Sequence, residues 1–459
     1  MIPGGMDTNL IDSGVDWIGQ IPEHWDTTRI RFVARLESGH TPSRSVDEYW
    51  QDCNIPWVTT KDIKKFRNTN KLYLEDTENK ISEKGLKNSG ARILPKDTVF
   101  LSRTASVGFS GVMGQKMATS QDFANWVCGP KVVPEYLAYV FRAMQQEFSR
   151  LMQGSTHQTI YMPDIRSLQM PLPPIDEQKE IANFISDRTD LLSETVVQKK
   201  DLRGLLSERR RAISTQYITG QNQSEVEMSD TSIPEVDLLP KHWEEVQIGW
   251  LIRSLRNGWS PNASSRAAEG EEYGVLKLSA ASEGEFKPQH NKALPPTTEV
   301  PDSSIVERGN VLVTRANTPE LVADACTVDQ HNRRLIAPDL MFIIETDTSQ
   351  IYPNFLSEWL VTPPARAQIR MDAHGSSGSM VKVSQQNLKS WVMPLPPQDE
   401  QKKILEKINR IREETSELKS MITETIDLLE EKRQGLITAA VTGEIDVSEV
   451  KNEAKASHT

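Results

Sequence analysis

A chain of 459 residues is long enough to bury more than one hydrophobic core, and 37% apolar with 25% charged residues is typical of a folded globular protein. The sequence contains no run of about 18 apolar residues and no N-terminal secretion signal, so we expect a cytoplasmic protein without a membrane partner. A net charge of -11 argues against binding to nucleic acid through bulk charge alone. Three isolated cysteines, Cys53, Cys128 and Cys326, lack the spacing of a zinc or redox site, which predicts buried thiols and no structural metal.

In chain order, a leader (1–25) precedes a first body (26–168) that mixes strand and helix patterns. "RILPKDTVFLSRT" is typical of a turn followed by a short buried strand, and "VPEYLAYVFRAMQQEF" has helical spacing. This body carries 20 basic and 15 acidic side chains, a balance of +5. We therefore expect an α+β domain that is mildly basic.

A long helical segment (169–220) follows, and it is repeated. "MPLPPIDEQKEI" from Met170 returns 223 residues later as "MPLPPQDEQKKI" from Met393, and the similarity runs without a gap from 155–220 to 378–443. Between the copies lie a polar linker (221–243) and a second body (244–391) with 14 basic and 18 acidic side chains, a balance of -4. The second long helix (392–443) and a tail (444–459) complete the chain. The chain is therefore two copies of one unit of about 220 residues.

Each long helix carries a heptad pattern of apolar residues. The positions expected in the seam are Ile181, Ile185, Leu192, Leu202 and Leu206 in the first copy, and Ile404, Ile408, Ile411, Leu418, Ile422 and Leu429 in the second. Roughly 38 helical residues at 1.5 Å each make a rod of about 57 Å, which Gly220 and Gly443 end. Two equal seams in one chain bury each other most simply as an antiparallel coiled coil; the alternative is that each helix lies across its own body. The expected fold is thus α+β, with two domains separated by a long antiparallel two-helix coiled coil and an internal pseudo-two-fold repeat.

No enzymatic motif accompanies this architecture. The sequence lacks a GxxxxGK[ST] phosphate loop, a GxGxxG fingerprint, a GxSxG elbow and an HExxH zinc motif. The Asp-Glu-Gln-Lys box is repeated and charged, but acidic residues at a helix start are explained by capping and by the helix dipole. We expect a non-catalytic protein with two different binding heads.

The layout resembles the specificity subunit of Type I restriction-modification enzymes. The resemblance rests on "PLPPIDEQKEI" and "PLPPQDEQKKI", each opening a long helix closed by "TG", and on "GHTPSRSVDEYW…IPWVTTKDI" from Gly39 to Ile63. It implies that the bodies are target-recognition domains, each reading one half of a bipartite asymmetric site in double-stranded DNA. The helices would set their spacing and dock two modification (methyltransferase) subunits, with two restriction/translocase subunits in the full complex. It also implies that this chain binds no cofactor. S-adenosylmethionine, ATP and magnesium would be bound by the partner subunits, which methylate adenine N6 or cut DNA.

Residues for DNA contact are predicted in loops of the bodies. Arg103 and Arg315 follow corresponding strands, in "SRTAS" and "TRANT", where a guanidinium can reach guanine O6 and N7 or a phosphate; the alternative is a surface arginine or an ion pair within its own domain. Hydroxyl groups and charge in a loop setting are also offered by "TPSRS" around Arg44 and by Thr59, Thr60 and Lys61. The competing function is a two-headed scaffold that positions protein partners without reading DNA.

Overall fold

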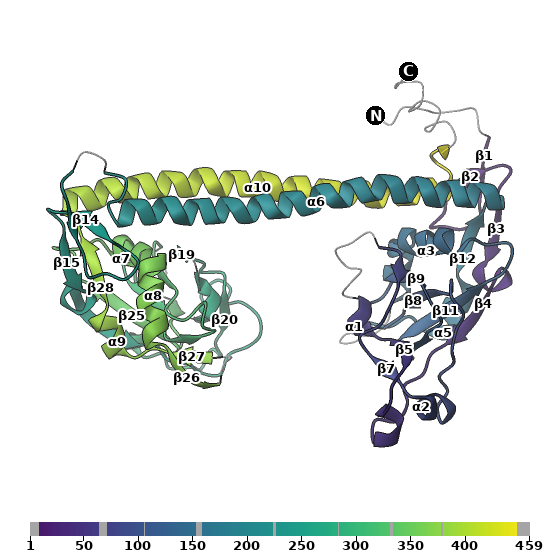
Figure 1. Ribbon diagram of the computed structural model, residues 1–459, viewed down its shortest axis with the longest axis horizontal. Coiled ribbons are helices and arrows are strands. Elements are labelled where there is room, and N and C mark those ends of the chain that lie inside the picture. The colour runs from purple at the N-terminus through teal and green to yellow at the C-terminus, as the bar shows by residue number, and fades with distance from the viewer. Residues whose placement is uncertain are drawn as a thin grey trace. The chain divides into compact units, whose positions relative to one another are not determined.

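The computed structural model describes residues 9–63, 71–104, 106–152, 158–223, 226–282, 284–330, 334–377 and 380–447, and structural statements below refer to these (Figure 1). The chain forms two compact units. The first comprises Met1–Asp201 with Ile422–Thr459, and the second Leu202–Met421. Each unit therefore holds one body and a part of both long helices.

In its described residues, the first unit has twelve strands and five short α-helices before the first long helix. Its central sheet has five strands in the order β4-β11-β8-β9-β6, and a smaller sheet has the order β10-β5-β7. α3 packs on β8 and β9. The strands are β1 (Leu10–Asp12), β2 (Gln20–Pro22), β3 (Asp26–Arg29), β4 (Ala34–Ser38), β5 (Ile55–Val58), β6 (Tyr73–Leu74), β7 (Lys80–Ile81), β8 (Val99–Ser102), β9 (Ser110–Met113), β10 (Ala118–Thr119), β11 (Phe123–Cys128) and β12 (Gln169–Leu172), and the helices are α1 (Thr60–Ile63), α2 (Glu83–Lys87), α3 (Pro134–Ala143), α4 (Gln145–Leu151) and α5 (Met162–Ser167).

The second unit repeats this plan with small changes. Its central sheet has four strands in the order β16-β25-β21-β23, and its smaller sheet has the order β20-β17-β24. α7 packs on β21 and β23. The strands are β13 (Met228–Asp230), β14 (Leu238–Pro240), β15 (Glu244–Gln247), β16 (Ile252–Asn257), β17 (Gly274–Leu276), β18 (Ala281–Ser282), β19 (Glu285–Phe286), β20 (Asn291–Ala293), β21 (Val311–Thr314), β22 (Ala316–Asn317), β23 (Ala325–Thr327), β24 (Leu335–Ile336), β25 (Met341–Thr346), β26 (His374–Ser377), β27 (Met380–Lys382) and β28 (Val392–Leu395), and the helices are α7 (Pro353–Leu360), α8 (Pro363–Asp372) and α9 (Gln385–Ser390).

The expected mixture of helices and strands in two domains is confirmed, and so are the strands expected from the turn-strand motifs. β8 and β21 are buried along their whole length, as short β-branched and apolar runs between two packed layers must be. Each follows a turn with one residue in the left-handed region, Asp97 (φ 67°) before β8 and Gly309 (φ 91°) before β21. The helical spacing after Pro134 and Pro353 likewise yields α3 and α7, each with Pro in its first turn.

The long helices are α6 (Ile175–Ile218, 44 residues) and α10 (Gln398–Thr442, 45 residues). Both begin at the Asp-Glu-Gln box and end at the predicted glycines, where Gly220 (φ 70°) and Gly443 (φ 78°) adopt the left-handed conformation that closes a helix. Figure 1 shows the parts of α6 and α10 within each unit lying side by side. In the first unit Lys200 Nζ lies 3.5 Å from Glu430 Oε1, and in the second Lys407 Nζ lies 5.2 Å from the centre of the Tyr217 ring.

The inward faces of the long helices differ from the expected seam at two of the eleven predicted positions. Leu202 and Leu418, predicted in the seam, are 42% and 47% exposed, whereas their neighbours Arg203 and Lys419 are half-buried. The remaining predicted positions are buried or half-buried: Ile181, Ile185, Leu192, Leu206, Ile404, Ile408, Ile411, Ile422 and Leu429. The reason for the difference is that long polar side chains bury their aliphatic stems, so an apolar pattern alone places the seam one residue off.

The repeated box does more than cap a helix. Gln178 is fully buried; its Oε1 accepts from Val133 N at 2.9 Å and its Nε2 donates to the carbonyls of Lys131 and Pro173. Glu177 accepts from Trp25 Nε1 at 2.8 Å. The second copy repeats both roles, with Gln401 bound to the turn before α7 and Glu400 bound to Trp243.

The box therefore ties each long helix to the loop that opens the body's main helix and to the "HW" pair before the body. An expectation of capping and dipole effects alone was too narrow, because the amide and carboxylate bonds are long-range in sequence and no local pattern shows them.

Candidate nucleic-acid interface

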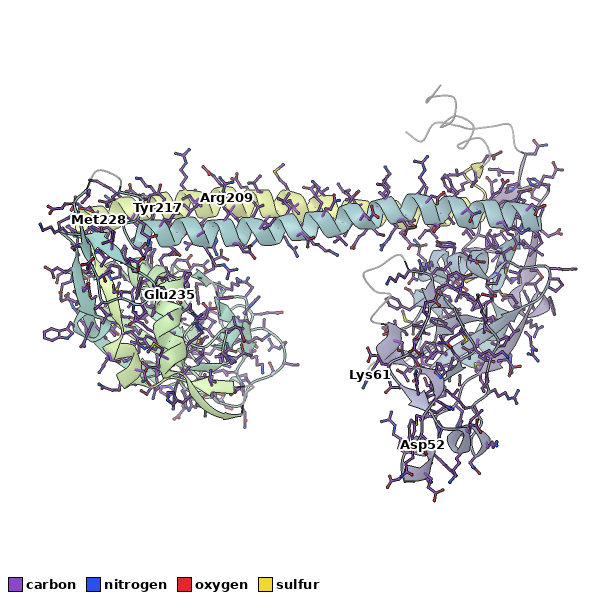
Figure 2. All side chains as sticks on the ribbon, viewed as in Figure 1. Asp52, Lys61, Arg209, Tyr217, Met228 and Glu235 are labelled. Carbon is purple, nitrogen blue, oxygen red and sulfur yellow. The ribbon has the colours of Figure 1, made fainter. Side chains whose placement is uncertain are left out.

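The first body has a hollow of about 720 Å³ at one end of its sheets. Arg44, Thr59, Thr60 and Lys61, predicted from separate stretches, all line it. They are brought together because the small sheet β10-β5-β7 places the end of β5 beside the loop after β4. Figure 2 shows Lys61 at the surface of this unit.

A buried carboxylate holds the Thr59–Lys61 turn in place. Asp62 is fully buried, and its Oδ2 accepts from both the backbone N (2.8 Å) and the Oγ1 (3.0 Å) of Thr59. Its Oδ1 accepts from Glu78 N at 2.8 Å. Because Asp62 fixes the turn from inside, Thr60 and Lys61 are presented outward on a rigid support.

Two tryptophans form the inner wall of the hollow. Trp57 is buried and donates from Nε1 to the carbonyl of His40 at 3.3 Å. Trp50, half-buried, packs edge-to-face on Trp57 with 5.5 Å between ring centroids and donates to the carbonyl of Ser43. These contacts occupy both indole N–H groups, so the pair supports the loop that carries Arg44.

Arg103 has a different environment from the one expected for a free contact residue. Its Nε donates to the carbonyl of Gln121 at 3.0 Å, and its Nη1 lies 3.4 Å from the carbonyl of Ile160. Gln121 lines the hollow and its Oε1 accepts from Thr41 Oγ1. Arg103 thus braces the wall of the hollow through its own domain, which corresponds to the alternative of an intradomain contact, with backbone carbonyls in place of a carboxylate.

In the second body Arg315 holds the equivalent place after β21. Its backbone N donates to the carbonyl of Leu340 and its carbonyl accepts from Val383 N. The Arg315 side chain is half-buried, and within the described part of the chain no hydrogen bond or ion pair of its guanidinium is found. Arg315 belongs to the second unit, and its surroundings there leave this guanidinium available.

Sequence reasoning missed several polar residues of the hollow: Thr41, Asp47, Asn79, Gln121 and Asp122. Gln121 and Asp122 come from the polar run "SQD" between β10 and β11, a signal that could have been used. Across the described residues, the exposed side chains of Arg44 and Lys61 have no ion-pair partner. Cations and hydroxyl groups on a fixed surface can contact phosphates and base edges, respectively.

The thiols offer no nucleophile for chemistry of their own. Burial raises the pKa of Cys128 to about 12, and burial also raises the pKa of Cys326. Burial and the nearby Asp52 raise the pKa of Cys53. All three therefore stay protonated at neutral pH, and a thiol is a poor nucleophile.

No group of three or more His, Cys, Asp or Glu side chains in the described ranges is arranged to hold a metal ion. No helix in the same ranges has the length and apolar character needed to cross a membrane.

Comparison with known proteins gives concordant results. The family model "Type I restriction modification DNA specificity domain" matches residues 22–201 and 240–428. The MjaIX specificity subunit of Methanocaldococcus jannaschii is 30% identical over 238 residues, which are 51% of this chain and 53% of that protein. The EcoEI specificity subunit of Escherichia coli is 30% identical over 40% of this chain and 31% of its own length, so the chain spans about half or less of these two relatives. The EcoKI specificity subunit of Escherichia coli K12 is 20% identical over 93% of this chain and 90% of its own length.

A solved structure described as the structural basis of complex assembly and conformational transition of the type I R-M system has the same fold. It covers 93% of this chain and 99% of its own, with a TM-score of 0.59 and 16% identity. Because the family model covers most of both repeats, this chain belongs to the family of Type I restriction-modification DNA specificity domains.

Proposed function

We propose that this chain is the sequence-specificity subunit of a Type I restriction-modification complex, and that each body reads one half of a bipartite asymmetric DNA site. One observation carries the proposal: the two bodies share a sheet plan but place different side chains at the same edge. After the matching strands β5 and β17, the first body presents Thr59, Thr60 and Lys61, and the second presents Lys277 and Ser279. A common scaffold with divergent polar edges suits two readers of different sequences.

The charge distribution supports a division of work. The first body carries a balance of +5 and the second -4, so neither supplies the large positive surface that tight phosphate binding needs. Phosphate contacts would then come largely from other subunits, and this chain would contribute base contacts. Affinity of the isolated chain for DNA would be low.

We also propose that α6 and α10 form one antiparallel coiled coil that sets the distance between the bodies and docks two modification subunits. The proposal is supported by helix-to-helix contacts inside each unit, such as Lys200 with Glu430. Leu205 and Leu428, equivalent positions in the repeat, are both exposed, which suits further helices packing on the rod. S-adenosylmethionine would bind to those modification subunits, and ATP and magnesium would bind to two restriction/translocase subunits. The location would be the cytoplasm.

The test is binding of defined duplexes by the chain assembled with its modification subunit. Methylome sequencing with and without the chain first identifies the bipartite motif. The complex should then bind that duplex at least 1,000-fold more tightly than a scrambled one, the lower end of typical specificity ratios. Equal binding to both duplexes would favour the scaffold function.

Variants of the hollow sharpen this test. Arg44→Ala with Lys61→Ala should weaken the preference at one half-site and leave the other half-site unchanged, because both cations belong to the first body. Lys96→Ala is the matched control, since Lys96 is exposed in the turn before β8, at the other end of that strand from Arg103. An equal loss at both half-sites would contradict separate reading by the two bodies.

A further inference from the structure

Each unit exposes one aromatic side chain at the same place in its fold. Phe32 is 69% exposed and Trp250 is 76% exposed. Among the described residues, each is the most exposed large apolar side chain of its unit. The 3₁₀ helices that carry them, η1 (Ile30–Phe32) and η3 (Ile248–Leu251), occupy equivalent positions just before β4 and β16.

The aromatic residues are not displaced members of the core. In each turn the flanking apolar residues point inward: Ile30 and Val33 are buried around Phe32, and Ile248 and Leu251 around Trp250. The core positions of the turn are therefore filled. Because the outward aromatic recurs in both copies, it is a feature of the surface, and aromatic side chains are enriched at interfaces.

Basic side chains lie near both aromatic residues, and one basic position is shared by the two copies. Arg31 stacks over the Phe32 ring, with 5.1 Å from its guanidinium carbon to the ring centre. α5 packs on η1 and carries exposed Arg166, and α9 packs on η3 and carries exposed Lys389, which is Arg166's equivalent in the repeat. Lys389 lies directly against Gly249, the neighbour of Trp250. Each surface thus combines an aromatic residue with positive charge; we name the two surfaces the Phe32 patch (Phe32, Arg31, Arg166) and the Trp250 patch (Trp250, Lys389).

The strand register places these patches away from the candidate DNA interface. In the first unit Ser38 of β4 pairs with Ala124 of β11, at the end of the sheet where β8 leads into Arg103. At the opposite end Ala34 of β4, which lies next to η1, pairs with Cys128 of β11. The second unit repeats this, with Asn257 at the Arg315 end of its sheet and Ile252, after η3, at the other. Duplex DNA bound at the reading edges would therefore leave both patches uncovered.

We propose that the Phe32 and Trp250 patches are docking sites for two copies of one protein subunit. Each copy would receive the aromatic ring of one patch in an apolar recess with an acidic rim. The repeat supports a single kind of partner, because equivalent surfaces on equivalent folds fit the same surface twice. The positive charge selects an acidic rim, and aromatic anchors with arginine neighbours are the residue types that dominate protein interfaces. The inference rests on the proposed function, in which the subunit bound in two copies is the methyltransferase.

The experiment assembles the full-length chain with the methyltransferase subunit of the same complex and measures stoichiometry by native mass spectrometry during a titration. Phe32→Ser should weaken the uptake of one copy about tenfold and leave the other unchanged. Trp250→Ser should do the same for the other copy, and the double variant should weaken both. Ile93→Ser and Leu321→Ser, at exposed apolar positions outside the patches, are the controls and should change neither step.

The charge on each patch is tested separately. Arg166→Glu should weaken the copy that Phe32→Ser weakens, and Lys389→Glu the copy that Trp250→Ser weakens. All these side chains are exposed, so thermal unfolding of each variant should match the wild-type chain.

Two outcomes overturn the inference alone: uptake of both copies with unchanged affinity in the double variant, or unchanged uptake with weaker binding of the DNA duplex. The second outcome would assign the patches to DNA. If the wild-type chain took up no methyltransferase subunit, the proposed function itself would fail, which is distinguishable from failure of the patches.

Discussion

The two units attach their bodies to the long helices in different ways at one equivalent position. In the first unit that position on α3 is Tyr139, which is buried and stacks under Arg142, while Gln434 of α10 donates to the carbonyl of Arg142 at 2.9 Å. In the second unit the same position on α7 is Glu358, which is 5% exposed and forms a short ion pair with Arg412 of α10. The first junction places the Arg142 guanidinium on an aromatic ring, and the second pairs a buried carboxylate with a guanidinium.

Elsewhere the two junctions are alike. Gln178 and Gln401 make the same three bonds, and Trp25 and Trp243 donate to the same glutamate of the box. The contacts that fix where a body joins its helix are thus duplicated, whereas the packing of its main helix against the rod has diverged. Four tests, in order of decreasing effect, examine this contrast.

Arg412→Ala should have the largest effect and should be confined to the second unit. It leaves the Glu358 carboxylate buried without its main partner, which costs about 3 kcal/mol or more. Hydrogen exchange should accelerate in β21 and β25 and remain unchanged in β8 and β11. Restoring a neutral pair with Arg412→Met and Glu358→Leu should recover most of the loss; equal acceleration in both units would contradict the assigned difference.

Gln178→Ala and Gln401→Ala should each destabilise by about 2 kcal/mol, because each leaves a buried backbone N–H and two carbonyls without their partner. The two losses should be equal within error, each in its own unit, as measured by hydrogen exchange. Gln198→Ala, on an exposed position of α6, is the control. Unequal losses would show that the duplicated box is not equivalent in the two copies.

Glu400→Gln should show a pH-dependent effect of about 1 kcal/mol. Burial raises the pKa of Glu400, but hydrogen bonds from Trp243, His242 and Gln223 outweigh it, so its pKa is lower in the folded chain than the usual value. Such a carboxyl contributes stability above its unfolded pKa of about 4.3, and the contribution is lost as the pH falls through the lower folded pKa.

Unfolding of wild type and Glu400→Gln should therefore differ at pH 7, and the difference should shrink as the pH falls below about 4.3. A difference that grew on acidification would contradict the direction of the pKa shift.

Lys200→Ala should have the smallest effect, at most about 0.5 kcal/mol. The Lys200–Glu430 pair joins the two helices in the first unit, but both side chains are more than a third exposed, so water and salt screen their attraction. Denaturant unfolding at low and high salt measures it. A loss as large as that of Arg412→Ala would remove the distinction between exposed and buried charge on which the comparison depends.

The candidate interface was predicted in part. Arg44 and Thr59–Lys61 were chosen for their residue types and loop settings, and the fold does gather them around one hollow. Arg103 was chosen in the same way, yet its guanidinium is bound to the carbonyls of Gln121 and Ile160. A sequence shows which side chains are able to donate, but a nearby carbonyl from a distant segment decides where the donors point.

The sequence by itself determined the duplication, the two long helices with their glycine ends, and the strands β8 and β21, because repeats, heptads and short apolar runs are local patterns. Only the tertiary structure decided that Arg203 and Lys419 turn inward beside exposed Leu202 and Leu418, that Gln178 and Gln401 bind distant turns, and that Phe32 and Trp250 face outward at equivalent places. Each of these depends on atoms far apart in the chain, whose approach is set by packing rather than by the residues next to them.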